Sequence, residues 1–277
     1  MTETFGVQLR ERLRDAGPLC VGVDPSSALL ELWDRPDHVD GLEFFALAVL
    51  EAVSDVVAVI KPQVAYFERF GAAGYRVLER LIAEAHDAEL MVVADAKRGD
   101  FNATNQGYAQ AWLRDASPLA VDAVTVHPYL GVDALAPFFD AAESSGRGVF
   151  VLSATSNDEG RGVQGARTAD NERVDESILR RVSELNHRDA GLGSIGVVLG
   201  ATRDRPNFDL ASLSGPYLVP GLGEQGANAG DLARLFDRRG ECTVLASVSR
   251  AILKAGPHKG GLHDAARRWR DDLRDVL

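Results

Sequence analysis

Short apolar runs alternate with longer helical patterns along the chain, and this alternation constrains the fold more than any other feature. The runs are nearly continuous in apolar character, which is typical of parallel strands covered on both faces. The predicted strands are Leu19–Asp24, Val56–Lys61, Leu90–Lys97, Val121–His127, Gly148–Leu152, Ile195–Gly200, Pro216–Pro220 and Cys242–Ser247. Between them, segments such as Gly41–Val53 and Tyr75–His86 repeat apolar residues every three or four positions, which predicts helices.

Eight strand-then-helix units in 277 residues favour an α/β fold of one domain, a (β/α)8 TIM barrel spanning residues 1–277. A doubly wound open sheet is the alternative, because periodicity shows the alternation and not the closure of the sheet. Hydrophobic residues make up 45% of the sequence, so a large core is available. The sequence contains no linker-like tract and no internal repeat that would divide it.

Composition narrows the classes of function. A net charge of −11 and a pI near 5.0 argue against a broad nucleic-acid footprint, although a local basic pocket would still bind one anion. No apolar run approaches the roughly 20 residues that cross a bilayer, and the start is typical of an amphipathic helix rather than a signal peptide. We therefore expect a cytoplasmic protein without membrane contact.

The cysteines and histidines give no sign of a metal site. Cys20 and Cys242 lie in apolar runs, which indicates small core residues in a reduced compartment. The six histidines are scattered, and none stands with Cys, Asp or Glu at metal-ligand spacing. We therefore expect no metal site and no cofactor.

Polar residues gather at the C-terminal ends of the predicted strands. Asp24 ends the first strand and Lys61 the second, and each is followed by a proline, which fits where a strand ends. Asp95 and Lys97 end the third strand and His127 the fourth. The fifth strand is followed by Ser153, Thr155 and Ser156. Because barrel enzymes carry their catalytic groups on the loops at this end, the placement predicts an active site there.

The spacing on the third strand indicates how its charges are arranged. Asp95 and Lys97 are two residues apart and therefore point to the same face, at the barrel mouth. Together with Lys61 they would form a compact array of alternating charge. Gly99 would relax the backbone after the strand and let Asp100 leave along a different path. A structural ion-pair network is the alternative, but the charges at matching ends of neighbouring strands favour a functional array.

Two late segments have the pattern of a phosphate site. Pro220–Asp231 is rich in glycine and follows the seventh strand, while Ser247–Ile252 follows the eighth. In barrels the loops after these strands commonly hold a phosphate with backbone N–H groups and a helix N-terminus. The glycines would let the backbone approach the anion, and two side chains would add donors. The residues concerned are Gly221, Gly223, Gly226, Gln225 and Arg250.

Motifs along most of the chain resemble the orotidine 5′-phosphate decarboxylase family, and in particular its bacterial subgroup with longer chains. "VVADAKRGD" is similar to the family's D-x-K-x-x-D signature, which related sugar-phosphate decarboxylases also carry. The combination with "IKPQ", "TSN" and "SRAI" is more specific. "VGVDP", "VTVHPYLGVDALAPF" and "VPGLGEQGAN" follow the family's order as well. The resemblance implies a TIM barrel that converts orotidine 5′-phosphate to UMP and CO2.

The resemblance also implies roles for the charged array. Lys97 would stabilise the developing carbanion and deliver the proton. Asp95 would lie against the substrate carboxylate and hold Lys97. Lys61 would complete the array and reach the ribose, and Asp24 would bind a ribose hydroxyl.

Further roles follow from the same resemblance. Asp100 and Thr104 would act across the interface of a homodimer, because the family's second aspartate comes from the neighbouring subunit. Ser156 would contact the pyrimidine, while Gln225 and Arg250 would hold the phosphate.

One segment departs from the family pattern. Many relatives read D-I-G-x-T after the signature lysine, whereas this chain reads Asp-Phe-Asn-Ala-Thr over residues 100–104. The spacing to the threonine is kept, but the missing glycine leaves the path of the backbone open.

Three other functions compete with this interpretation. One is a barrel lyase that acts on a keto-sugar phosphate with Mg²⁺ held by carboxylates. Another is an aldolase that forms a Schiff base on Lys97 or Lys61, which requires a depressed lysine pKa. The third is a barrel that binds a nucleotide without turning it over.

Overall fold

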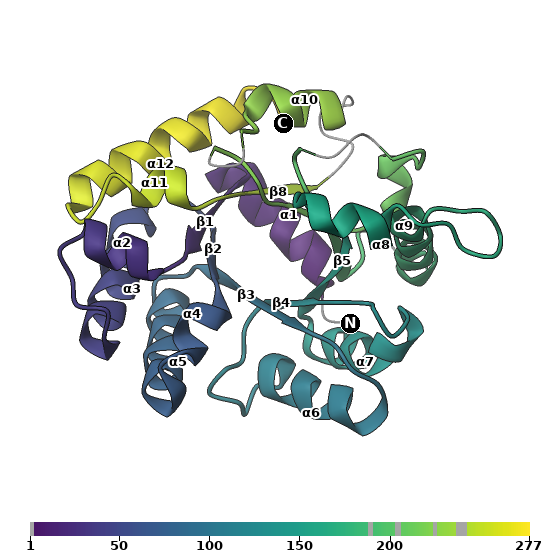
Figure 1. Cartoon of the computed structure of the whole chain (residues 1–277), viewed down its shortest axis with the longest axis horizontal. Coiled ribbons are helices and arrows are strands. Elements are labelled where there is room, and N and C mark those ends of the chain that lie inside the picture. Colours follow the sequence, from purple (N-terminus) through teal and green to yellow (C-terminus); the bar gives the residue numbers. More distant parts are fainter. Residues whose placement is uncertain (1–2, 188–190, 203–205, 224–225, 237–242) are drawn as a thin grey trace.

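The computed structural model describes residues 3–187, 191–202, 206–223, 226–236 and 243–277. Within these residues, eight parallel strands form a closed barrel in the order of the sequence, which confirms the predicted (β/α)8 barrel and excludes the open sheet (Figure 1). The strands are β1 (Leu19–Val23), β2 (Val59–Pro62), β3 (Met91–Arg98), β4 (Ala123–Val126), β5 (Gly148–Ala154), β6 (Ile195–Leu199), β7 (Tyr217–Val219) and β8 (Val244–Val248).

Helices surround the barrel and form most of the connections between successive strands (Figure 1). The α-helices are α1 (Phe5–Ala16), α2 (Ser27–Leu32), α3 (Val39–Val53), α4 (Val64–Glu68), α5 (Gly71–Asp87), α6 (Asn102–Leu113), α7 (Ala136–Ser145), α8 (Arg161–Gln164), α9 (Val174–Asn186), α10 (Ala229–Leu235), α11 (Arg250–Leu253) and α12 (Lys259–Arg274). Three short 3₁₀ helices are η1 (Asp133–Leu135), η2 (Asp158–Gly160) and η3 (Leu210–Leu213). None of the described helices combines the length and apolar character needed to cross a membrane.

The strands bury apolar side chains on both faces, because alternate residues point inward and outward. Outward residues such as Val21 and Val92 belong to a large cluster shared with the surrounding helices. Inward residues such as Cys20 and Val93 form a second cluster inside the barrel. This double burial explains the nearly continuous apolar runs of the sequence.

The first helix closes the N-terminal end of the barrel. Its apolar face, which includes Phe5 and Leu9, packs into the inner cluster, and Figure 1 shows the purple α1 across the centre of the strand ring. The Phe5 ring meets Phe150 of β5 edge-on, with ring centroids 6.0 Å apart. Gly148 makes room for this ring, since a Cβ there would lie 2.2 Å from Phe5 Cδ1. The opposite end, where the strands end, is left for the charged residues.

The predicted strands differ from the observed ones mainly at their ends. The run Val56–Lys61 becomes a strand only from Val59, because Val56 and Val57 are buried in the turn after α3. The strand predicted from Pro216 begins at Tyr217. Strand β5 continues to Ala154, two residues further than expected. Cys242 lies outside the described residues.

Candidate active site

One buried carboxylate forms the centre of the site at the C-terminal mouth of the barrel. Asp95 Oδ2 accepts a hydrogen bond from Lys61 Nζ at 3.1 Å, and Asp95 Oδ1 accepts one from Lys97 Nζ at 2.5 Å. Lys61 is 5% exposed and Asp95 is 9% exposed, whereas the Lys97 side chain is 45% exposed. The carboxylate therefore joins one buried ammonium group to another that faces the open mouth.

Local strand geometry explains why these side chains meet. Asp95 continues the inward series of β3, two residues after Val93, and Lys61 continues that of β2. At the end of β3 the Lys97 backbone has a φ of +46°, a left-handed conformation that non-glycine residues adopt infrequently. Gln63 follows β2 and donates its side-chain amide to Asp95 Oδ2 at 2.9 Å.

Mutual attraction keeps the array charged. Burial alone favours a neutral Asp95, but the ammonium groups of Lys61 and Lys97 outweigh burial and hold its pKa well below the ordinary range. Burial likewise disfavours the Lys61 ammonium, yet the carboxylates of Asp95 and Asp24 hold the pKa of Lys61 above its ordinary value. A Schiff-base lysine needs the opposite shift, so the aldolase interpretation is disfavoured for Lys61.

One carboxylate oxygen of Asp24 accepts a hydrogen bond from the protein, and the other has no partner among the described residues. Ser249 Oγ, from the turn after β8, donates a hydrogen bond to Asp24 Oδ2. Gly22 permits this approach, since a Cβ there would lie 2.7 Å from Ser249 Cβ. Asp24 Oδ1 is buried and has no hydrogen-bond partner among the described residues. A buried acceptor without a partner is unfavourable, so this oxygen is suited to a hydroxyl donor from a ligand.

The charged array lies on a fold shared with known enzymes. Residues 17–264 match the model of the Orotidine 5′-phosphate decarboxylase / HUMPS family. Orotidine 5′-phosphate decarboxylase of Salinispora tropica is 50% identical over 275 residues, covering 99% of both chains. The enzyme of the same name from Streptomyces coelicolor is 46% identical over 276 residues, again covering 99% of both. The chain belongs to the orotidine 5′-phosphate decarboxylase family.

Solved structures agree with this membership. The crystal structure of a Streptomyces avermitilis protein has a TM-score of 0.93 at 45% identity and covers 99% of this chain and 96% of its own. The Leishmania donovani OMP decarboxylase structure has a TM-score of 0.77 at 30% identity and covers 99% of both chains.

The family's second aspartate stands apart from the array. The Asp100 carboxylate accepts the Phe101 N–H at 2.8 Å, and it forms no ion pair with another described residue of its own chain. Its peptide is fixed instead: Asp100 N–H donates to the Asn105 side chain at 2.9 Å, and the buried Asn105 amide also donates to Ala134 O at 2.6 Å. Thr104 is exposed on α6. Asp100 is half-buried, and Asn105 anchors the segment that carries both residues.

The residue at the departure from the family motif has a left-handed backbone. Asn102 occupies the position of the missing glycine, and its φ is +50°, in the left-handed region that glycine adopts freely. Asparagine tolerates this region better than most residues. Gly99 permits a close approach of the chain to His127, rather than a relaxed backbone as predicted. It does not have a left-handed φ, and a Cβ there would lie 2.5 Å from His127 O.

Three glycines of the predicted phosphate loop have left-handed backbone conformations. Gly221, Gly223 and Gly226 have φ angles of +103°, +78° and +88°. Arg250 is exposed at the first position of α11. Gln225 lies outside the described residues, so its predicted phosphate contact stays a prediction.

Ser156 lies half-buried in the loop after β5. Gly200 lets this loop approach β6, because a Cβ there would lie 2.7 Å from Ser156 N. The adjacent Thr155 is held by Gln164 of α8, which accepts from Thr155 N at 3.0 Å and donates to Thr155 Oγ1 at 2.7 Å. The short helix α8 therefore fixes the loop that carries Ser156.

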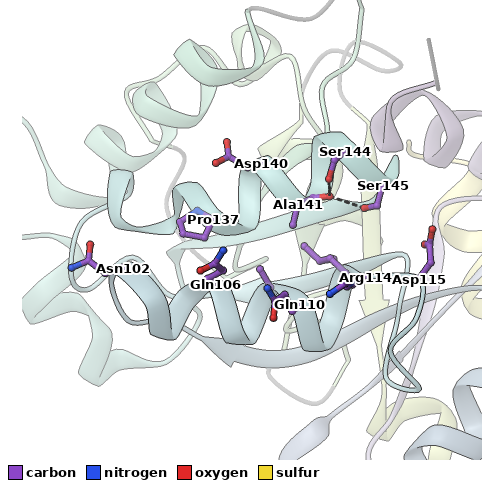
Figure 2. Close-up of a pocket in the computed structure, with 12 residues that line it drawn as sticks. Asn102, Gln106, Gln110, Arg114, Asp115, Pro137, Asp140, Ala141, Ser144 and Ser145 are labelled. Atoms are coloured by element: carbon purple, nitrogen blue, oxygen red, sulfur yellow. Dashed lines mark hydrogen bonds between the residues drawn. The ribbon is translucent and has the colours of Figure 1, made fainter.

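A separate groove of about 670 Å³ lies between α6 and α7 (Figure 2). Gln106 and Gln110 of α6 face Pro137 and Ala141 of α7 across it (Figure 2). None of the candidate site residues lines this groove. We therefore place the active site at the strand ends.

Sequence reasoning missed four polar side chains that fix the candidate residues. They are Gln63, Asn105, Thr125 and Ser249. Strand parity was the available signal for Thr125, which stands two residues before His127 on the inward face of β4. Asn105 carried no comparable signal, because its contacts join loops that are distant in sequence.

Proposed function

We propose that the chain, as a member of this family, converts orotidine 5′-phosphate to UMP and CO2 in the last step of pyrimidine nucleotide synthesis. The observation that carries the proposal is the array of Lys61, Asp95 and Lys97 at the barrel mouth, with one ammonium group accessible from the open end. The relatives named above supply the substrate, and the array supplies the chemistry.

The reaction breaks a carbon–carbon bond and leaves an electron pair on a ring carbon. We propose that the Lys97 ammonium group stabilises this carbanion and then donates the proton that replaces CO2. Its hydrogen bond to Asp95 holds the charge in place before the reaction starts. Such preorganised electrostatic stabilisation requires no metal and no organic electron sink.

Repulsion between Asp95 and the substrate carboxylate is a smaller effect. Two like charges about 4 Å apart interact by roughly 4 kcal/mol at an effective dielectric of 20. Enzymes lower their barriers by about 8–23 kcal/mol, so repulsion supplies only a minor share. Stabilisation of the carbanion by Lys97 carries more of the effect, and binding energy from the remote phosphate adds to it.

The chain also carries groups suited to the ribose and the phosphate of the substrate. The unpartnered Asp24 Oδ1 is suited to accept a ribose hydroxyl, and Lys61 adds a nearby cation. Arg250 and the glycine-rich loop after β7 are suited to the phosphate, since left-handed glycines expose backbone N–H groups to an anion. Gln225 completes the proposed phosphate site, and Ser156 is assigned to the pyrimidine.

We also propose that the enzyme is a homodimer in which Asp100 and Thr104 complete the partner's site. Both lie outside the array of their own chain, which suits residues that act on a neighbouring subunit. Exposed apolar side chains occur beside Asp100 and in the loop after β4: Phe101 is 56% exposed, Tyr129 79% and Leu130 50%. Large apolar side chains grouped on a surface favour a protein interface.

The test is to incubate the purified protein with orotidine 5′-phosphate and EDTA and to follow the loss of orotidylate absorbance. Wild-type protein should form UMP with EDTA present. Lys97→Ala should lose turnover but still fold and unfold cooperatively, because Lys61 continues to pair with the buried Asp95 carboxylate. Lys259→Ala on the exposed face of α12 is the control and should keep full activity.

Other outcomes favour the competing functions. Activity that EDTA abolishes would support the metal-dependent sugar-phosphate lyase. Borohydride trapping of a carbonyl substrate on a lysine would support the aldolase. Tight UMP binding by a folded protein without any decarboxylation would support a nucleotide-binding barrel.

A further inference from the structure

A single hydroxyl group connects the two reacting-site residues of β3. Thr125 lies on β4 and is 1% exposed. Its Oγ1 donates a hydrogen bond to Asp95 Oδ1 at 2.9 Å and accepts one from the Lys97 backbone N–H at 3.0 Å. The same hydroxyl therefore contacts the carboxylate that holds Lys97 and the backbone from which Lys97 extends.

An irregularity in the sheet creates the need for this hydroxyl. Strands β3 and β4 pair at Ala94↔Val124 and again at Arg98↔Val126, so β3 uses more residues than β4 over the same stretch. Within this bulge Lys97 has its left-handed φ of +46°. Its N–H is directed to a side chain of β4 rather than into a regular ladder. A bulge that redirects a side chain is typical of strand ends beside active sites.

The geometry also fixes the direction of the hydroxyl proton. A threonine hydroxyl has one hydrogen to donate and lone pairs that accept. Because the Lys97 N–H occupies a lone pair, the hydrogen is left for Asp95 Oδ1. Asp95 Oδ1 then has Thr125 and the Lys97 ammonium as donors, while Oδ2 has Lys61 and Gln63. The carboxylate is held by donors on both oxygens and cannot rotate freely.

We propose that Thr125 is a positioning residue for the decarboxylation, an inference that depends on the function proposed above. Its hydroxyl holds the Lys97 backbone in the left-handed conformation and fixes the Asp95 carboxylate against the Lys97 ammonium. Together these two bonds keep the ammonium group at the point where the carbanion forms. Thr125 itself does not contact the reacting carbon.

The alternative is that Thr125 is only a core residue whose hydroxyl satisfies buried polar groups. The two roles differ in what they change. A core role affects the free energy of unfolding, whereas a positioning role affects turnover more than ligand binding. Displacement of a catalytic group by about 1 Å lowers rates by about 100-fold.

The experiment compares Thr125→Val, which has the same shape without the hydroxyl, with Thr125→Ser, which keeps it. For each variant we would measure kcat and KM for orotidine 5′-phosphate, the Kd for UMP and the thermal unfolding temperature. Thr125→Ala supplies the comparison if the valine variant does not fold. Thr243→Val is the matched control. Thr243 is also buried, but it directly precedes β8 at the N-terminal end of the barrel, away from the charged array.

We expect Thr125→Val to lower kcat by about 10- to 100-fold, with KM and the UMP Kd within about threefold of wild type. Thr125→Ser should recover most of kcat, and Thr243→Val should keep it. A kcat within about twofold of wild type in a folded Thr125→Val would overturn the proposal. Equal losses in the serine and valine variants would also overturn it. A wild-type protein without decarboxylase activity would instead remove the proposed function, and this inference with it.

Discussion

Single residues beside the charged array hold backbone shapes that their side chains do not favour. Lys97 and Asn102 both have left-handed φ angles, and they lie on either side of the segment that carries Asp100. At Lys97 the Thr125 hydroxyl receives the backbone N–H. At Asn102 the residue type itself supplies the tolerance, since asparagine visits this region more readily than other non-glycine residues. The left-handed backbone at position 102 therefore forms without a glycine.

Substitution of Asn102 should reveal this preference. Asn102→Gly should leave the free energy of unfolding and the activity close to wild type, because glycine has no Cβ penalty at positive φ. Asn102→Ala should lower the free energy of unfolding by about 1 kcal/mol, because alanine is strained there. Urea unfolding measures both.

The neighbouring helix position provides the control. Ala103→Gly should destabilise by roughly 0.5–1 kcal/mol, because glycine is unfavourable at an ordinary helical position. Equal stability of the Asn102→Ala and Asn102→Gly variants would contradict the strain argument.

At the scale of elements, the Asp95 carboxylate accepts hydrogen bonds from side chains of three neighbouring strands. Lys61 comes from β2, Asp95 and Lys97 from β3, and Thr125 from β4. A buried charge with its partners removed is strongly unfavourable, so the loss of one member affects the others. The array therefore contributes to the closure of this side of the barrel as well as to chemistry.

Asp95→Asn tests this structural contribution through its pH dependence. The variant should lower the free energy of unfolding by about 3 kcal/mol at neutral pH, because Lys61 stays buried without its carboxylate. The folded-state pKa of Asp95 is lowered, so its stabilising contribution is fully present above the unfolded value of about 3.9. The contribution is lost as the pH falls from there towards the lowered folded value.

The measurement is urea unfolding of wild type and variant between about pH 3 and pH 7. The difference between the two should be constant near neutral pH and should shrink as the pH falls below about 4. Ser144→Ala, on the exposed surface of α7, removes no ionisable group and should show no such trend. A difference that is independent of pH would mean that folding does not lower the pKa of Asp95.

The strands also show which features of the fold could be predicted from the sequence and which could not. The barrel was predictable because every buried strand is a short apolar run, and the array of Lys61, Asp95 and Lys97 because strand parity places charges on one face. Strand ends were less predictable, since Val56 and Val57 are apolar yet belong to a turn. Strand parity could have indicated the inward position of Thr125, but the bonds of Asn105 depend on tertiary approach that no local spacing encodes.

At the scale of the whole molecule, the proposed dimer would place Asp100 and Thr104 of one chain at the site of its partner. Asp100 is half-buried, Thr104 is exposed, and Phe101, which follows Asp100, is largely exposed. A twofold interface would bury these loops against the same loops of a second copy, because both subunits use the same surface. Each of the two sites would then contain residues of both chains.

Mixing two inactive variants tests the shared site. Lys97→Ala and Asp100→Ala should each be inactive, but a hybrid dimer contains one site without either lesion. An equal mixture should recover about a quarter of wild-type activity after subunit exchange, since half the dimers are hybrids and half their sites are intact. Initial rates of UMP formation measure the recovery.

The control mixture pairs Lys97→Ala with the Lys97→Ala/Asp100→Ala double variant, which offers no intact site and should stay inactive. Light scattering and exchange of a labelled subunit establish that hybrids have formed. An inactive mixture of the two single variants under those conditions would contradict the proposal that Asp100 acts across the interface.

The closure of the barrel floor by α1 has a consequence for how the chain is made. The Phe5 N–H donates to Ser194 Oγ at 3.1 Å, a contact across 189 positions, and the Phe5 ring packs on Phe150. As the polypeptide leaves the ribosome, its first helix emerges well before the strands that receive it. The apolar face of α1 therefore stays exposed until about two thirds of the chain has been synthesised. During this interval it is available for binding by a chaperone.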